Sequence, residues 1–194
     1  MHHTPRLILK KMQFEDLEGL KSPFTYESPF FYDIILKKKP NDLGWSIDLT
    51  KKPFDPPFHK YGEEIIADAY KSKAHFYSAY LKNSDESQKI GWICVDHFSW
   101  NKTSRLWDID ISLPCRHQGF GTELMDFIKK ICKENGSRAI VLECQSSNYL
   151  AIQFYLKMGF QLGGIDSIAY TNEDIEKHEV RLEMVYLFPK KSKK

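Results

Sequence analysis

Long apolar runs are missing from this sequence of 194 residues. No run approaches the roughly 18 residues that are typical of a transmembrane helix. Residues 1–5 also lack the apolar stretch of a secretory signal. We therefore expect a cytoplasmic location and no membrane contact.

Metal-binding and disulfide patterns are also missing. The four cysteines show no C-x-x-C spacing, and the seven histidines show neither H-x-x-x-H nor H-E-x-x-H. Reduced thiols in the core are therefore expected, with no disulfide and no metal site. These cysteines are Cys94, Cys115, Cys132 and Cys144.

Neither sign of charge dominates, because 28 Lys and Arg residues balance 26 Asp and Glu residues. A net charge of +2 gives no argument for a nucleic-acid partner, and we expect none. A hydrophobic fraction of 42% is typical of a folded globular protein. We expect one domain over residues 1–189 and a solvated Lys-rich tail over residues 190–194. The sequence leaves open whether the protein forms a homodimer.

Hydrophobic periodicity predicts an alternation of strands and helices. The alternating or continuous apolar segments predict strands, and the segments with apolar residues three or four apart predict helices. Strands are expected over residues 6–10, 75–81, 88–98, 105–113, 139–144, 160–170 and 179–188. Helices are expected around residues 14–20, over 61–71, over 119–133 and from the N-cap Asn148 to Met158. Residues 22–60 hold six of the nine prolines, which predicts packed loops and short helices there.

The glycine-rich segment Arg116-His117-Gln118-Gly119-Phe120-Gly121-Thr122 follows a predicted strand and opens a long amphipathic helix. Glycines let the backbone approach a ligand closely. The unpaired N–H groups and positive dipole end of a helix start favour a phosphate group. The spacing therefore predicts a pyrophosphate cradle, and a simple strand-to-helix turn is the alternative interpretation.

A second motif lies on the helix after the next strand and reads Asn148-x-x-Ala151-x-x-Phe154-Tyr155-x-x-x-Gly159-Phe160. The two motifs in this order resemble the GNAT superfamily of N-acetyltransferases. This resemblance implies an α/β fold of one domain, with a mixed, mainly antiparallel sheet flanked by helices. It also implies that the first motif binds the pyrophosphate of acetyl-CoA, and that the second flanks the thioester.

Other segments are similar to the streptothricin acetyltransferase branch of that family. They include Leu142-Glu143-Cys144-Gln145 and Gly163-Gly164-Ile165-Asp166. Members of this branch usually carry Glu immediately before the Asp of the fourth strand, where this sequence has Trp107.

The resemblance assigns roles to particular residues. Tyr155 would protonate the departing thiolate, although a core aromatic on an amphipathic helix is the alternative. Asn148 would contact the cofactor or simply cap the helix. The cofactor-binding residues implied are Ile111, Ser112 and Leu113 through their backbone, residues 116–122 named above, and Asn148, Ala151, Phe154 and Tyr155.

Strict alternation along residues 105–113 puts Leu106, Asp108, Asp110 and Ser112 on one face of the strand, opposite Trp107, Ile109 and Ile111. Asp108 and Asp110 are therefore catalytic candidates that would hold a cationic substrate or accept the amine proton. Glu143 and Asp166 are weaker candidates for the acceptor side.

We therefore expect an acetyl-CoA-dependent enzyme that acetylates a primary amine of a small molecule, such as a streptothricin-like cationic antibiotic. Two alternatives remain open. One is a peptide or protein N-acetyltransferase, and the other is a non-catalytic acyl-CoA-binding sensor.

Overall fold

The computed structural model describes residues 6–17, 21–38, 44–65, 74–82 and 88–189. The chain divides into two compact units. The first contains Met1–Phe24, Glu63–Leu142 and Tyr186–Lys194, and the second contains Thr25–Gly62 and Glu143–Val185. Among the helices of the described residues, none is long and apolar enough to cross a membrane. The tail over residues 190–194 lies outside the described residues, so its solvation stays a prediction.

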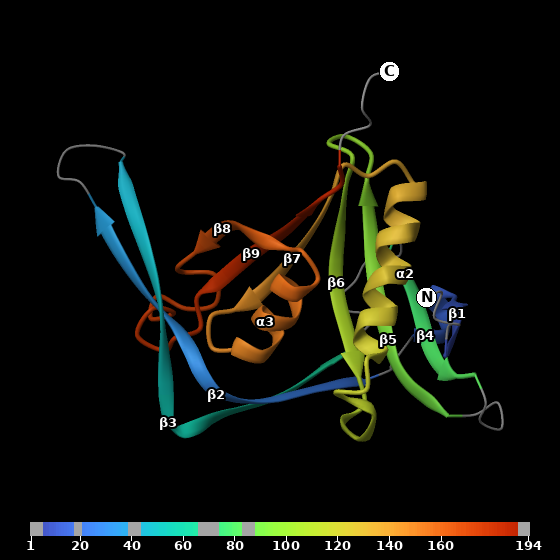
Figure 1. Cartoon of the computed structure of the whole chain (residues 1–194), viewed down its shortest axis with the longest axis horizontal. Helices are drawn as coiled ribbons and strands as arrows, with labels where there is room; N and C mark the ends of the chain where they lie inside the picture. The colour runs from blue at the N-terminus through green and yellow to red at the C-terminus, as the bar shows by residue number, and fades with distance from the viewer. Residues whose placement is uncertain (1–5, 18–20, 39–43, 66–73, 83–87, 190–194) are drawn as a thin grey trace. The chain divides into compact units, whose positions relative to one another are not determined.

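The first unit is built on a sheet whose strands follow the order β1-β4-β5-β6-β7 (Figure 1). Each neighbouring pair from β1 to β6 is antiparallel, whereas β6 and β7 are parallel. The mixed, mainly antiparallel sheet expected from the sequence is thus confirmed. The strands are β1 (Leu7–Met12), β4 (His75–Leu81), β5 (Lys89–Phe98), β6 (Thr103–Ile111) and β7 (Ala139–Gln145), whose last residues belong to the second unit.

One helix of the first unit, α2 (Phe120–Glu134), runs alongside β5 and β6 (Figure 1). Its buried residues recur at helical spacing, which gives the helix one apolar side. They are Phe120, Leu124, Met125, Ile128 and Cys132. The helix ends at Asn135, and Gly136 follows with a φ of 75°, as the Asn-Gly pair predicts.

The strand β6 contains a β-bulge at Trp107, so its side chains do not alternate strictly as predicted. Cys94 lies opposite Asp108, but the next residue of β5, Val95, lies opposite Leu106. Because consecutive residues of β5 point to opposite faces, Leu106 and Asp108 also lie on opposite faces. The prediction that Leu106 shares a face with Asp108 is therefore wrong. The extra residue lets Leu106 join Ile109 and Ile111 on the apolar face.

A hydrophobic cluster covers the face of the sheet opposite to that of Leu106, Ile109 and Ile111. Buried Trp92 and Cys94 pack there with Phe76 of β4 and Leu17 of the short 3-10 helix η1 (Phe14–Leu17). The rings of Phe76 and Trp92 stack with centroids 6.0 Å apart. Residues that pair across two neighbouring strands share a face of the sheet. Asp108 pairs with Cys94 and Asp110 pairs with Trp92, so both carboxylates lie on the face that carries this cluster.

All four cysteines are buried free thiols, as the sequence predicts. Burial raises the pKa of Cys132 to about 11 and that of Cys144 to about 12. Because the thiolate is the reactive form, both side chains are inert at neutral pH.

A long two-stranded ribbon is formed by β2 (Lys21–Lys38) and β3 (Trp45–Ile65). Its residues Thr25–Gly62 belong to the second unit, whereas the first residues of β2 and the last of β3 belong to the first. The prediction of loops and short helices is therefore wrong for residues 22–38 and 45–60, and residues 39–43 lie outside the described ranges. In a strand with a single neighbour, alternate backbone N–H groups point away from that neighbour and take no part in the pairing. Proline, which lacks an N–H group, is tolerated at these positions. The aromatic and β-branched residues of this segment favour strands, and this preference outweighs that of the prolines for loops. Buried Phe31 and Ile34 anchor the ribbon.

The remaining elements of the second unit are the end of β7, α3 (Tyr149–Lys157), β8 (Gln161–Asp166) and β9 (Arg181–Leu187), which begins there and ends in the first unit. The strands follow the order β7-β9-β8. The helix predicted over residues 61–71 is wrong for residues 61–65, which continue β3, and residues 66–73 lie outside the described ranges. The 3-10 turn η2 (Leu113–Cys115) replaces the end of the strand predicted over residues 105–113.

A histidine network connects β5, β6 and the end of α2 in the first unit. His97 Nδ1 lies 2.7 Å from Ser104 Oγ, and the Asn135 amide nitrogen lies 2.8 Å from His97 Nε2. With Asn135 donating to Nε2, neutral His97 carries its proton on Nδ1 and donates to Ser104. The ring of His75 lies 5.5 Å away, centroid to centroid. Burial lowers the pKa of both histidines, Lys11 and His75 add to the effect, and Asp96 opposes it.

We expect the protein to lose stability as the pH falls below 6.5, the ordinary pKa of histidine in an unfolded chain. The unfolded chain then binds protons that the folded state resists, so the free energy of unfolding decreases. Thermal unfolding midpoints at pH 7.5 and pH 5.5 measure the effect. His97→Gln should reduce the difference between the two midpoints, whereas the same change at exposed His59 should leave it unchanged. An equal pH dependence in both variants would contradict the assignment.

Candidate active site

The glycine-rich turn links β6 to α2 through η2. His117 and Gly119 both have left-handed backbones, with φ of 61° and 90°. Gly119 is the N-cap of α2, and no side chain caps the helix start. The first-turn N–H groups of an α-helix have no partner within the helix, so an anion can bind them. The role of this turn as a phosphate cradle stays a prediction.

Arg116 turns back from this segment toward the end of β6. Its Nε donates to the Ile111 carbonyl at 2.7 Å, and its Nη2 lies 3.1 Å from Asp110 Oδ1. Arg116 and Asp110, which the sequence analysis placed in different roles, therefore form one ion pair. This pair lies at the start of the glycine-rich turn and neutralises part of the Asp110 charge.

The backbone from Ile111 to Leu113 already makes several hydrogen bonds. The Ser112 N–H donates to the Ile90 carbonyl at 2.8 Å. The Ser112 and Leu113 carbonyls accept from the N–H groups of Cys115 and Arg116. A carbonyl has two lone pairs, so these oxygens can still accept from the amides of a pantetheine arm.

The strand β6 has a different partner strand on each of its two edges. The pairing of β6 with β7 covers Thr103–Arg105 against Ala139–Val141 among the described residues. The following residues of β6 pair with β5 on the other side.

Gly91 fixes how closely β5 approaches β6 at this point. A Cβ atom at Gly91 would lie 2.2 Å from the Asp110 carbonyl oxygen and 2.9 Å from Ile111 Cδ1. Only a residue without a side chain fits there, so Gly91 sets the backbone position of Asp110. The sequence analysis did not identify this residue, because its role depends on a cross-strand contact.

The second motif lies on α3 in the second unit. Asn148 caps this helix, and its side chain accepts from the Ala151 N–H at 3.2 Å, as predicted. The centroid of the half-buried Tyr155 ring lies 5.5 Å from that of Phe154 and 5.9 Å from that of Phe160. These two contacts restrict the movement of the ring.

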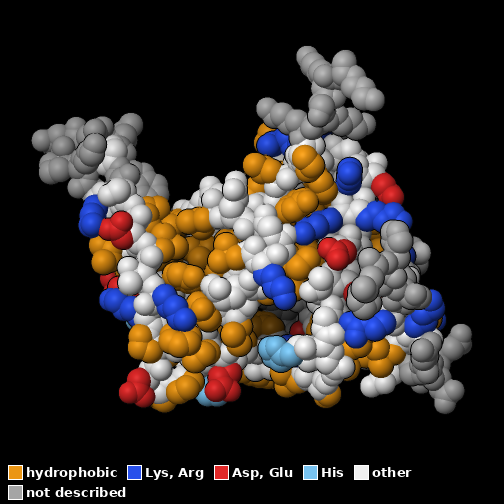
Figure 2. Space-filling model, in the orientation of Figure 1, with side chains coloured by type: hydrophobic (Ala, Val, Ile, Leu, Met, Phe, Trp, Pro, Cys, Tyr) orange, Lys and Arg blue, Asp and Glu red, His pale blue; other side chains and the backbone are white. Residues whose placement is uncertain are grey.

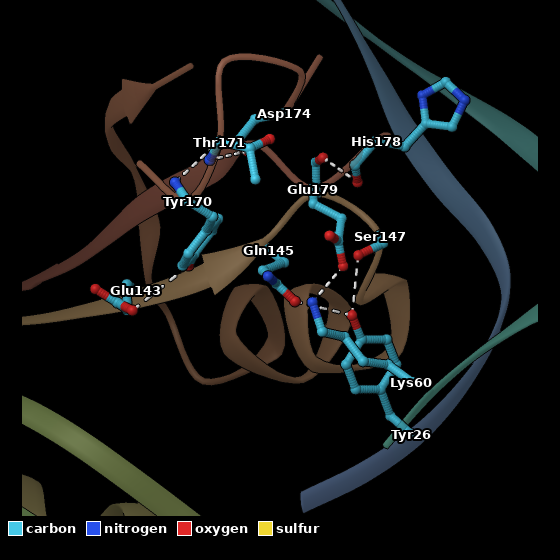
Figure 3. A network of polar contacts seen from close by, with 11 residues as sticks. Tyr26, Lys60, Glu143, Gln145, Ser147, Tyr170, Thr171, Asp174, His178 and Glu179 are labelled. Atoms are coloured by element: carbon cyan, nitrogen blue, oxygen red, sulfur yellow. Dashed lines mark hydrogen bonds and ion pairs between the residues drawn. The ribbon is translucent and has the colours of Figure 1, made fainter. Parts of the chain in front are cut away.

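A polar network in the second unit surrounds the end of β7 (Figure 3). Tyr26 of the ribbon lies 3.1 Å from Gln145 Oε1 and 2.9 Å from Ser147 Oγ. Lys60 pairs with Glu179, and Asp174 accepts from the backbone N–H groups of Tyr170 and Thr171. Burial raises the pKa of Tyr26, which keeps its hydroxyl neutral. The sequence analysis missed this network, because loops were predicted over residues 22–60.

The two weaker acceptor candidates lie in the same unit and share one cation. Arg181 lies 3.1 Å from Asp166 Oδ2 and 3.7 Å from Glu143 Oε2. The Tyr170 hydroxyl lies 3.5 Å from Glu143 Oε1. Two carboxylates and one guanidinium leave this group with a net negative charge.

The structure distributes the predicted residues over the two units. Asp108, Asp110, residues 111–113 and the turn over residues 116–122 belong to the first unit, and Asn148, Ala151, Phe154 and Tyr155 belong to the second. Among the described residues there is no group of three or more His, Cys, Asp or Glu that could hold a metal ion. Lys and Arg side chains are dispersed over the face shown in Figure 2 and mixed with acidic ones.

The chain is similar to two curated streptothricin acetyltransferases. It is 27% identical to that of Streptomyces lavendulae over 160 residues, which is 80% of each chain. It is 30% identical to streptothricin acetyltransferase A of Bacillus subtilis (strain 168) over 123 residues, 63% of this chain and 70% of the relative.

A solved structure has the same fold. It is a Bacillus anthracis protein in complex with acetyl coenzyme A, with a TM-score of 0.67, 24% identity, and coverage of 94% of this chain and 98% of the other. The model of the acetyltransferase (GNAT) family matches residues 45–160, more than half of the chain. Both sequence motifs lie within that match. The chain therefore belongs to the acetyltransferase (GNAT) family, and it is an N-acetyltransferase that uses acetyl-CoA.

Proposed function

We propose that the enzyme acetylates a primary amine of a cationic small molecule of the streptothricin type. The observation that carries this proposal is the similarity to a streptothricin acetyltransferase over 80% of both chains. The carboxylates on β6 support it, because they would attract a cationic acceptor. Such an activity would confer resistance to the antibiotic. We also propose a cytoplasmic location, where acetyl-CoA is available.

The turn over residues 116–122 is proposed to hold the pyrophosphate of acetyl-CoA through its backbone N–H groups. The left-handed residues His117 and Gly119 and the uncapped start of α2 support this role. The backbone of Ile111, Ser112 and Leu113 would bind the pantetheine arm. Asn148, Ala151 and Phe154 on α3 would flank the thioester.

Tyr155 is proposed as the general acid. When the amine attacks the thioester carbonyl, the carbon–sulfur bond breaks and the sulfur departs as a thiolate that needs a proton. A phenol with an ordinary pKa near 10 can supply that proton to a thiolate of similar basicity. The ring contacts with Phe154 and Phe160 would hold the phenol in one orientation.

The carboxylates of β6 are proposed to hold the acceptor. Asp108 and Asp110 lie on one face, and Arg116 already neutralises part of the charge of Asp110. A carboxylate close to an ammonium also raises the pKa of that amine and slows its deprotonation. A diamine would avoid this conflict, since one ammonium would bind and the other, farther away, would lose its proton to water and attack.

Replacing Asp108 by asparagine is expected to raise KM for a cationic acceptor about tenfold, which corresponds to about 1.4 kcal/mol for a half-exposed charge pair. KM for acetyl-CoA should stay unchanged. Asp110→Asn is expected to raise both KM values, because it also releases Arg116 beside the cradle. Asp126→Asn, an exposed change on α2, is the control. KM values for the acceptor that ignore both β6 substitutions would rule out this acceptor site.

A screen of amines, with thiol release as the readout, tests the proposed function. Streptothricin-like and other lysine-like diamines should give the highest kcat/KM, and the rate should rise with pH as the attacking amine deprotonates. Highest activity on peptide N-termini would instead indicate a peptide N-acetyltransferase. Thiol release that no amine stimulates, with CoA still bound, would indicate a sensor.

A further inference from the structure

Arg6, immediately before β1, reaches the glycine-rich turn from the other end of the sequence. Its Nη2 donates to the Gln118 carbonyl at 2.8 Å, across a separation of 112 residues. Its Nε and backbone N–H donate to the two carboxylate oxygens of Glu123 at 2.6 and 3.0 Å. Its guanidinium carbon lies 4.4 Å from the centroid of the Phe120 ring. One side chain thus contacts three residues of the turn and the first helical turn.

We propose that Arg6 is a positioning residue of the phosphate cradle, an inference that rests on the proposed role of residues 116–122. It orients one peptide group of the turn toward the anion, and it neutralises an acidic side chain next to the same position.

The first effect follows from peptide geometry. In a planar trans peptide, the carbonyl and the N–H point in opposite directions. Arg6 holds the Gln118 carbonyl on its own side, so the N–H of Gly119 in the same peptide points away from Arg6. The left-handed φ of 90° at Gly119 accommodates this orientation. A Cβ atom at Gly119 would lie 3.1 Å from Arg6 Nη2, which shows how closely the guanidinium packs against the turn.

The second effect is electrostatic. Glu123 lies in the first turn of α2, where its negative charge would repel a bound pyrophosphate. Arg6 makes a charge-assisted pair with Glu123, which removes most of that repulsion. Both side chains remain partly exposed, so the pair itself stabilises the fold only slightly. Its consequence is therefore expected in anion binding rather than in folding.

Kinetics with two acetyl donors test this role. Acetyl-CoA carries the pyrophosphate, and S-acetylpantetheine carries the same thioester without it. Arg6→Gln is expected to raise KM for acetyl-CoA about tenfold, the equivalent of one lost charge-assisted interaction. It should leave kcat/KM for S-acetylpantetheine within about twofold. Arg6→Lys should be intermediate, because an ammonium keeps the charge but cannot form the two-pronged contact with Gln118 and Glu123. Lys10→Gln removes an equal charge from β1, the strand that Arg6 precedes, and should leave the kinetics with both donors unchanged.

Glu123→Gln separates positioning from a purely structural ion pair. If the pair only supported the fold, losing either partner would have the same effect. Our proposal predicts different effects for the two variants. Arg6→Gln should raise KM for acetyl-CoA, whereas Glu123→Gln removes a repulsive charge and should not raise it. Equal losses with both donors in Arg6→Gln, or a raised KM for acetyl-CoA in Glu123→Gln, would overturn the role of Arg6. Failure of the cradle itself would appear in the wild-type enzyme, as equal KM values for the two donors.

Discussion

Replacing Tyr155 by phenylalanine is expected to lower kcat by about 10²–10⁴-fold, the usual contribution of general acid catalysis. The change removes only the hydroxyl group, so the packing of the ring against Phe154 and Phe160 should persist. Affinity for CoA and the thermal unfolding midpoint should therefore stay near the wild-type values. Steady-state kinetics with a saturating acceptor, together with calorimetry for CoA binding, measure the two effects separately.

Tyr149→Phe is the matched control for this experiment. Tyr149 lies on the same helix, and its hydroxyl group lies 3.0 Å from Lys51 Nζ of the ribbon. Losing that hydroxyl group should leave kcat unchanged. If Tyr155→Phe retains the parent turnover, Tyr155 is a packing residue and water protonates the thiolate.

Substituting Gly121 by aspartate is expected to weaken CoA binding by about 2 kcal/mol or more, which is about 30-fold. The new carboxylate would lie in the first turn of α2, where the pyrophosphate is proposed to bind. An acidic residue at that position interacts favourably with the helix dipole, so the folded state should not be destabilised by its charge. The variant should therefore lose affinity for CoA while keeping its unfolding midpoint.

Gly121→Asn separates the effect of charge from that of size. Asparagine has nearly the volume of aspartate without its charge, so it should weaken CoA binding less. Isothermal calorimetry on the three proteins gives the comparison. Unchanged CoA affinity in a folded Gly121→Asp protein would remove the turn from the account of cofactor binding.

The sequence by itself determined those elements whose pattern is local. The apolar spacing and terminal Asn-Gly of α2, the apolar segments that form β4 and β5, and the cap at Asn148 depend on residues a few positions apart. The order of the two motifs likewise sufficed for the family, which the match over residues 45–160 supports. Local steric preference and burial of one face act over such distances, so they can be predicted without a structure.

Only the tertiary structure decided the rest. The prolines of residues 22–60 favour loops locally, but pairing and the burial of Phe31 and Ile34 stabilise a long ribbon. The bulge at Trp107 places Leu106 on the same face as Ile109, whereas strict alternation would separate the two side chains. Arg6 contacts the glycine-rich turn across more than a hundred residues. These features depend on contacts that form only when distant segments fold together, and their energies outweigh the local preferences on which sequence patterns report.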